Sequence, residues 1–177
     1  MGESYHHYHT GITRLTWDDV MRMCRELAER VQVEYDPDII LGIAKAGVIP
    51  GAILASMLRK EFYPIRLSRR VKDRVVREKP AVLVPVPDEV EGKIVLIVDE
   101  IAATGETLRL AVGEARKRQA KKVKTATLYV HTESWRPHWY ALETENLIIQ
   151  PWDFEVLVRG KWVIHPEYQD EIDRIEE

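Results

Sequence analysis

The run from Ile94 to Leu108 constrains the fold of this chain more than any other stretch. Ile94–Val98 is short, apolar and mostly β-branched, which is typical of a strand buried on both faces of a sheet. Asp99 and Glu100 follow at the point where we expect that strand to end, and a turn of small residues leads into a helical pattern that continues to Gln119. In open α/β sheets, ligands bind just beyond the carboxyl ends of the strands, so this unit predicts a binding site as well as a fold.

The turn and the two acids together indicate the chemistry of the ligand. Backbone N–H groups at the start of a helix favour phosphate, because they lack partners within the helix and lie at the positive end of its dipole. The adjacent carboxylates of Asp99 and Glu100 suit sugar hydroxyls. We therefore expect a ligand that carries both hydroxyls and a phosphate, such as a phosphorylated ribose. The plain alternative is a strand–turn–helix crossover with a Thr-Gly bend.

A second candidate anion loop follows the strand predicted at Ile39–Ile43. Lys45 lies there among the small residues Ala44, Ala46 and Gly47, and an apolar helix follows. A cation among small residues at a strand end lets the backbone close around an anion. The chain lacks the Gly-Lys-Ser/Thr ending of a nucleotide-binding P-loop and the G-x-G-x-x-G fingerprint of dinucleotide sites, so we exclude kinase and dinucleotide readings.

The other predicted elements complete an α/β fold with a mostly parallel central sheet flanked by helices. We treat residues 1–177 as one domain, with a core over about 15–131 and a hood formed by about 132–177 and the N-terminal segment. The predicted elements are a helix over Trp17–Val31 behind a capping box at Thr16–Asp19, strands at Ile39–Ile43 and Phe62–Leu67, an edge strand or hairpin arm at Ala81–Pro87, and a last core strand at Val123–Val130. Beyond His131 we expect no long helix.

Composition narrows the class of protein. The 177 residues are 45% hydrophobic and 31% charged, which fits a globular domain rather than a disordered chain. The net charge of -3 argues against a dedicated nucleic-acid binder, and no apolar run approaches the length that spans a membrane. Cys24 is the single cysteine, which excludes an internal disulfide and fits a reducing, cytoplasmic setting.

The central run resembles the phosphoribosyl-pyrophosphate motif of the type I phosphoribosyltransferases, in which a hydrophobic strand and two acids precede a Thr-Gly-x-Thr loop. The resemblance implies that Asp99 and Glu100 hold the ribose hydroxyls, that the loop wraps the 5′-phosphate, and that Lys45 acts with them in catalysis on the pyrophosphate. It also implies a non-proline cis peptide at Ala44–Lys45. The substrate-binding residues that it implies in these loops are Ala44, Ala46, Gly47, Ile101, Ala102, Ala103, Thr104, Gly105, Glu106 and Thr107.

Two further segments extend the resemblance. The basic stretch over residues 68–79 matches the flexible hood loop that closes over pyrophosphate in this family, with Arg69 and Arg70 as the first candidate contacts. Leu147-Ile148-Ile149-Gln150-Pro151-Trp152-Asp153 resembles the Pro-Trp-Asp stretch of the bacterial xanthine–guanine enzymes. By that likeness Leu147 covers one face of a purine and Ile101 the other, Ile148 offers backbone contacts, and Asp153 lies at the pocket edge.

The departures from the family pattern all fall on residues that handle the base. Ala103 replaces an Asp that many 6-oxopurine enzymes carry, His131 stands where a Lys often ends the last core strand, and Leu147 replaces a stacking Trp. Water, His131 or Glu106 is left to relay a proton. A general base contributes about 10²–10⁴-fold, so the loss of the Asp does not by itself exclude turnover.

The resemblance implies a salvage enzyme that joins a purine base to 5-phosphoribosyl pyrophosphate and releases pyrophosphate and a nucleoside monophosphate. A 6-oxopurine is the leading base. Magnesium is expected as cofactor, held mainly through the substrate, with Asp99 and Glu100 as the candidate protein ligands. A homodimer or homotetramer is the family habit. The alternatives are an adenine phosphoribosyltransferase, a non-catalytic sensor of sugar phosphate or nucleotide with the same fold, and a sugar-phosphate-binding module inside a larger complex.

Overall fold

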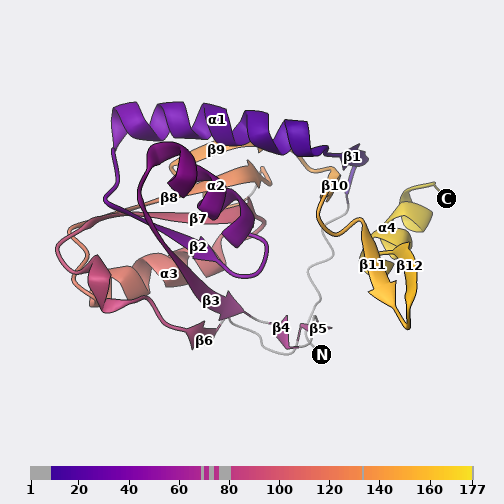
Figure 1. The fold of residues 1–177 in the computed structure, drawn as a ribbon. Helices are drawn as coiled ribbons and strands as arrows, with labels where there is room; N and C mark the ends of the chain where they lie inside the picture. The colour runs from indigo at the N-terminus through magenta and orange to yellow at the C-terminus, as the bar shows by residue number, and fades with distance from the viewer. Residues whose placement is uncertain (1–8, 69, 72–73, 76–80, 133, 177) are drawn as a thin grey trace. The chain divides into compact units, whose positions relative to one another are not determined.

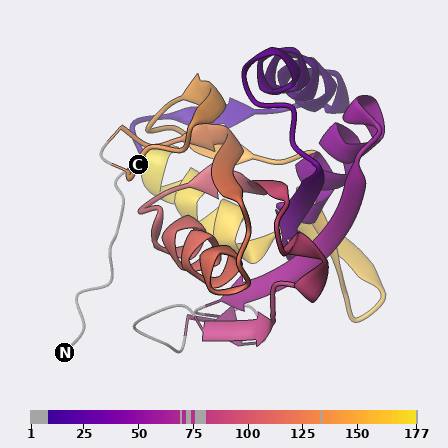
Figure 2. The ribbon, with the colours of Figure 1, turned by 90° about the vertical axis from the view of Figure 1, so that its left-hand side faces the viewer.

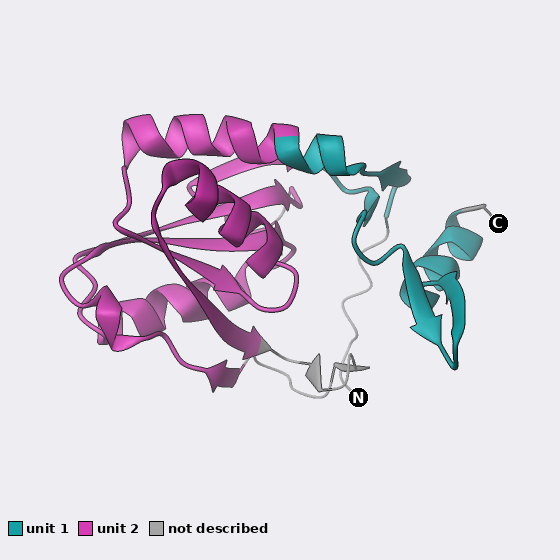
Figure 3. Cartoon of the chain, viewed as in Figure 1, with its two compact units in different colours: residues 1–21, 144–177 teal, residues 22–143 magenta. Residues whose placement is uncertain are grey.

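Figure 1 shows the fold of the chain in a computed structural model, and Figure 3 shows its division into two compact units. The structure describes residues 9–68, 70–71, 74–75, 81–132 and 134–176. The first unit comprises residues 1–21 and 144–177, and the second comprises residues 22–143. That these units act as one domain, with a core ending near residue 131, stays a prediction. Among the described residues, every helix is too short or too polar to cross a lipid bilayer.

A six-stranded sheet forms the centre of the second unit, with the strand order β6-β3-β2-β7-β8-β9. Neighbouring strands run parallel except β6, which pairs antiparallel with β3 at the edge. The predicted mostly parallel sheet and the edge position of the proline-flanked strand are therefore confirmed. The strands are β2 (Ile39–Ile43), β3 (Glu61–Ser68), β6 (Ala81–Val84), β7 (Ile94–Ala102), β8 (Lys122–Val130) and β9 (Trp139–Glu143).

Helices cover both faces of this sheet (Figure 2). They are α1 (Trp17–Glu34), α2 (Val48–Leu58) and α3 (Glu106–Lys117), and a short 3-10 turn, η1 (Asp88–Val90), precedes β7. On one face, Leu108, Ala111 and Ala115 of α3 pack in a buried cluster with Leu41 and Ile97 from the sheet. β2 and β7 are buried over most of their length, as their apolar sequences predicted. Their isoleucine, valine and leucine side chains form the centre of the sheet.

The first helix begins where its capping box predicted. The Thr16 N–H and hydroxyl both donate to the Asp19 carboxylate, at 3.0 and 2.7 Å, and the Asp19 N–H donates to the Thr16 hydroxyl at 3.1 Å. The buried stripe of α1 includes Cys24, Leu27 and Val31. The helix runs on to Glu34, three residues beyond the predicted end.

Two expectations about the sheet are wrong. Val123–Val130 is not the last core strand, because β9 pairs with β8 in parallel beyond it and buries Trp139. The acids do not follow the end of β7 but lie within it, since Ile101 and Ala102 still pair with β8. Both differences come from pairing across strands, which a local apolar run does not report.

The first unit is built from short strands and one helix. β1 (Ile12–Arg14) pairs in parallel with β10 (Leu147–Ile149), and β11 (Glu155–Val158) pairs antiparallel with β12 (Lys161–Ile164). The last helix, α4 (Pro166–Glu176), spans 11 residues, where we expected no long helix beyond His131. Its apolar residues Tyr168, Ile172 and Ile175 recur at helical spacing, and a proline occupies its first position, so a signal was present.

Candidate active site

Two carboxylates of like charge lie side by side in β7. Asp99 is only 8% exposed, Glu100 is half-buried, and the Glu100 N–H donates to the Asp99 carboxylate at 3.0 Å. Burial, followed by the repulsion of the Glu100 carboxylate, raises the pKa of Asp99 well above its ordinary value. Such a pKa shift, caused by desolvation and a neighbouring acid, is typical of functional sites.

The glycine turn (Ala103–Gly105) joins these acids to α3. Gly105 has φ +76°, a left-handed conformation that favours glycine, and it precedes the helix without a side-chain cap. The Glu106 N–H donates to the Thr104 hydroxyl at 3.4 Å. The first amides of α3 therefore follow a turn of small residues, as an anion site at a helix start requires.

The lysine loop (Ala44–Gly47) joins β2 to α2 and lies against Asp99. The Ala44–Lys45 peptide is cis, as predicted. A Cβ placed on Gly47 would lie 2.6 Å from Asp99 Oδ1 and 2.7 Å from the Asp99 Cα. Gly47 itself has an ordinary φ of -64°, so contact with Asp99, rather than backbone conformation, demands a glycine there. The structure thus brings Asp99, the glycine turn and the lysine loop together at the carboxyl ends of β2 and β7.

The remaining predicted contacts are not all brought to this place. Arg69 lies outside the described residues, and Arg70 begins a two-residue strand, β4 (Arg70–Val71), which pairs with β5 (Arg74–Val75). His131 directly follows β8, is 3% exposed, and its N–H donates to the Ala102 carbonyl at 3.2 Å. The second unit therefore brings His131 to the end of β7.

The predicted base-binding residues near the C-terminus belong to the first unit. Leu147 and Ile148 are buried in β10, and the Asp153 carboxylate accepts a hydrogen bond from the Tyr168 hydroxyl at 2.8 Å. Their roles beside a purine stay predictions.

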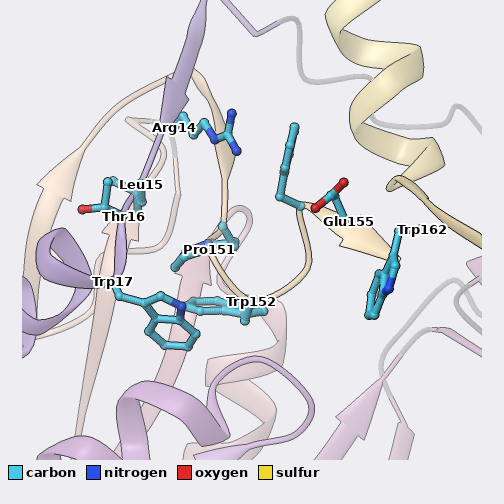
Figure 4. A pocket seen from close by; sticks show the side chains of 10 residues that line it. Arg14, Leu15, Thr16, Trp17, Pro151, Trp152, Glu155 and Trp162 are labelled. Carbon is cyan, nitrogen blue, oxygen red and sulfur yellow. The ribbon is translucent and has the colours of Figure 1, made fainter. Parts of the chain in front are cut away.

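An aromatic pocket of about 540 Å³ also lies in the first unit (Figure 4). Trp17, Trp152 and Trp162 line this pocket, and the ring centres of Trp17 and Trp152 lie 6.0 Å apart. The Arg14 guanidinium lies 3.9 Å from the centre of the Phe154 ring. Trp152 therefore packs within its own unit.

The carboxylates fit magnesium only as part of a larger set of ligands. Within the described ranges, no group of three or more His, Cys, Asp or Glu side chains is arranged to hold a metal ion. Asp99 and Glu100 supply hard oxygen donors, which magnesium prefers, but two carboxylates do not complete its octahedral shell. The donor set suits an ion held largely by ligand oxygens and water.

Comparison with known proteins agrees with this geometry. The family model described as "Phosphoribosyl transferase domain" matches residues 14–159. A purine phosphoribosyltransferase structure from Pyrococcus horikoshii superimposes with a TM-score of 0.72 and 31% identity, covering 84% of this chain and 98% of that one.

Two curated relatives match over shorter spans. An adenine phosphoribosyltransferase from Xanthomonas euvesicatoria is 38% identical over 99 residues, covering 51% of this chain and 53% of the relative. A hypoxanthine-guanine phosphoribosyltransferase from Schizosaccharomyces pombe is 28% identical over 130 residues, covering 62% of each. The chain thus spans about half the length of the adenine relative that it matches. With its family match, its fold and its two strand-end loops, the chain belongs to the phosphoribosyltransferase family and has the type I fold.

Proposed function

We propose that this protein is a purine phosphoribosyltransferase of nucleotide salvage. The observation that carries the proposal is the contact of the lysine loop with Asp99, next to the glycine turn. In the reaction, the bond from the anomeric carbon to pyrophosphate breaks, a bond to a purine nitrogen forms, and the base gives up a proton. The products are a nucleoside monophosphate and pyrophosphate.

Each part of the site has a task in this reaction. The amides of the glycine turn, with the hydroxyls of Thr104 and Thr107, bind the 5′-phosphate. Asp99 and Glu100 hold the ribose hydroxyls and stabilise the positive charge that develops on the sugar. Lys45 and the backbone of its loop bind pyrophosphate. Asp99 and Glu100 are the residues that would hold magnesium together with substrate oxygens, and the ion would supply positive charge to the leaving group.

The identity of the base depends on residues that depart from the family pattern. A 6-oxopurine is the leading base, and the Schizosaccharomyces relative is named for hypoxanthine and guanine. Adenine is the second candidate, because a Lys that would suit an oxygen at position 6 is replaced by His131, and the Xanthomonas relative is named for adenine. By the family resemblance, Leu147 and Ile101 are the candidate residues for contact with the faces of either base.

The cellular setting and assembly are part of the proposal. The buried single Cys24 fits a reducing cytoplasm. We propose a homodimer or homotetramer because these are the usual assemblies of the family. Analytical ultracentrifugation of the purified protein would test the number of subunits.

Pyrophosphate release tests the proposed reaction directly. The purified protein is given magnesium and 5-phosphoribosyl pyrophosphate, with guanine, xanthine, hypoxanthine, adenine or uracil offered separately and a reaction without base as control. We expect release that one purine stimulates. If no base stimulates release but the protein binds 5-phosphoribosyl pyrophosphate tightly, the proposed enzymatic function is wrong and a sensor with the same fold takes its place.

Replacing Ala103 tests the altered base handling. Ala103 is half-buried in the glycine turn, so Ala103→Asp returns a carboxylate to the position where 6-oxopurine enzymes have one. We expect oxopurine turnover to be preserved or raised. A collapse in affinity for 5-phosphoribosyl pyrophosphate would instead show that the turn serves a different ligand here.

A further inference from the structure

The side chain of Trp135 closes the space beside the glycine turn. A Cβ placed on Gly105 would lie 2.7 Å from the Trp135 Cβ, 3.0 Å from its carbonyl oxygen and 3.3 Å from its ring atom Cε3. Gly105 is therefore required twice, by its left-handed φ and by the tryptophan packed against it. The two nearest atoms are the Trp135 Cβ and its backbone carbonyl oxygen, and the indole ring adds the contact at Cε3, so the turn can move toward this segment only if Trp135 itself shifts.

Backbone hydrogen bonds join the same segment to the turn on both sides. The Trp135 N–H donates to the Thr104 carbonyl at 3.4 Å, and the His131 N–H donates to the Ala102 carbonyl at 3.2 Å. The segment is also bonded internally, because the Ser134 N–H donates to the His131 carbonyl and the Ser134 hydroxyl donates to the Trp135 carbonyl. These bonds fix the carbonyls that flank Ala103.

Trp135 is in turn held by the core. Its side chain is partly buried and packs against the buried cluster that contains Leu108 and Ala111 of α3. The tryptophan thus links the rigid helix that follows the turn to the turn itself. A side chain whose own position is fixed by core packing can hold a binding loop within the small tolerance that anion recognition needs.

We propose that Trp135 is a positioning residue for the glycine turn and sets the affinity of the site for the sugar 5′-phosphate. It acts through the orientation of the backbone amides at Thr104, Gly105 and Glu106, without touching the phosphate itself. The inference rests on the proposed function for the identity of the ligand. It separates two halves of the substrate, because the contacts that Trp135 makes with Gly105, with Thr104 and with the buried cluster of α3 all lie on the glycine-turn side of the site.

Calorimetry with two probes tests the inference in the full-length protein. Ribose 5-phosphate reports on the glycine turn, and inorganic pyrophosphate with magnesium reports on the lysine loop. Misplacing a binding group by about 1 Å can cost up to ~10²-fold, so we expect Trp135→Ala to weaken ribose 5-phosphate by about tenfold or more and pyrophosphate by less than about twofold. Trp135→Phe, which keeps a ring on the same Cβ, should restore most of the affinity.

A matched variant separates positioning from general stability. Trp139→Phe changes a fully buried tryptophan of the same unit that donates to Glu34, so it should lower the melting temperature and leave both affinities unchanged. Trp135→Leu keeps an apolar side chain but lacks the ring, and it replaces Trp135→Ala if that variant does not fold. Its affinity for ribose 5-phosphate should be lower than that of Trp135→Phe, with pyrophosphate affinity unchanged.

The outcomes distinguish this inference from the proposed function. Equal weakening of both probes, or unchanged ribose 5-phosphate binding in a folded Trp135 variant, overturns the positioning role even if the wild type turns over purines. Selective loss of ribose 5-phosphate binding supports the role even if no base stimulates pyrophosphate release from the wild type. In an active enzyme, the same defect should appear as a raised KM for 5-phosphoribosyl pyrophosphate with kcat nearly unchanged.

Discussion

The two ends of the six-stranded sheet differ in how their charged side chains are paired. At the amino ends, charged groups have partners on other elements: the Asp38 carboxylate accepts the Ile94 N–H at 2.8 Å, and the Lys124 ammonium lies 5.0 and 4.7 Å from the ring centres of Tyr35 and Trp139. At the carboxyl ends, two acids of the same sign stand next to each other in β7. The first arrangement stabilises the fold, and the second costs stability that a ligand or ion can recover.

Removing the acid pair should have the largest effect on turnover, with no loss of thermal stability. Asp99→Asn with Glu100→Gln should lower turnover by about 10³-fold or more, since even one electrostatic group aimed at a developing charge is worth about 10²–10³-fold. The melting temperature should stay near that of the wild type or rise, because a like-charge repulsion is removed. Pyrophosphate release and thermal unfolding measure the two effects.

The matched control makes the same chemical change at the other end of the sheet. Glu34→Gln with Asp38→Asn removes two acids that accept hydrogen bonds from Trp139 and Ile94, so it should lower the melting temperature and leave kcat unchanged. Full turnover by the Asp99/Glu100 variant would contradict the assignment of the ribose site.

Filling the contact between the lysine loop and Asp99 should have the next largest effect. In Gly47→Ala the new Cβ meets Asp99 at 2.6–2.7 Å, so the loop must move, and we expect KM for 5-phosphoribosyl pyrophosphate to rise about 10–100-fold. Gly113→Ala in α3 is the control, because nothing lies within 4 Å of its added Cβ. That change should stabilise the helix by about 0.5–1 kcal/mol and leave kinetics intact. If both variants keep wild-type KM, the loop does not bind the substrate.

Weakening the amino end should affect stability alone. Trp139 is 1% exposed, and its indole N–H donates to the Glu34 carboxylate at 2.8 Å. Trp139→Phe removes this bond and should lower the free energy of unfolding by about 1–3 kcal/mol, measured in urea. A change in KM of the folded variant would show that the two ends of the sheet are coupled.

The smallest predicted effect is a pH dependence at the amino end. Burial, then the charges of Lys124 and Arg116, lower the pKa of His138, and its Nδ1 accepts the Thr125 N–H at 3.2 Å, which requires a neutral ring. As the pH falls, the His138 ring is protonated in the unfolded chain before it is protonated in the folded protein. The contribution of His138 to the free energy of unfolding is therefore complete above its unfolded pKa of about 6.5, and it is lost as the pH falls through the lower folded pKa. His138→Gln should therefore lose less stability on acidification than the wild type. Parallel melting-temperature curves for the two proteins would contradict this.

The sequence predicts those features of the two sheet ends whose residues are close together along the chain. The carboxyl-end site could be predicted because its acids, its glycine turn and the start of α3 are consecutive residues whose spacing carries the chemistry. The lysine loop could be predicted for the same reason, and its cis peptide followed from the family resemblance. The capping box of α1 is equally local, and it fixed the start of that helix.

The rest depends on contacts between distant residues. Trp135 and Trp139 both fall in the range predicted to form the hood, yet one packs on the glycine turn and the other is buried in β9. Nothing within a short window separates these two roles, because each is set by pairing with β8 or by the space beside Gly105. The helix α4 is a different case, since its spacing was readable and its low apolar content hid it.

The parallel pairing of β1 with β10 has a consequence for how the protein is made. Ile12 leaves the ribosome early, but its partner Leu147 is synthesised only after the whole of the second unit. The strands of that unit lie in one continuous stretch and can pair during synthesis, whereas β1 must wait, because such a long loop is slow and entropically costly to close. β1 therefore has no partner until Leu147 has been synthesised, and a chain stopped before Leu147 would leave β1 as an open strand edge, a site prone to aggregation.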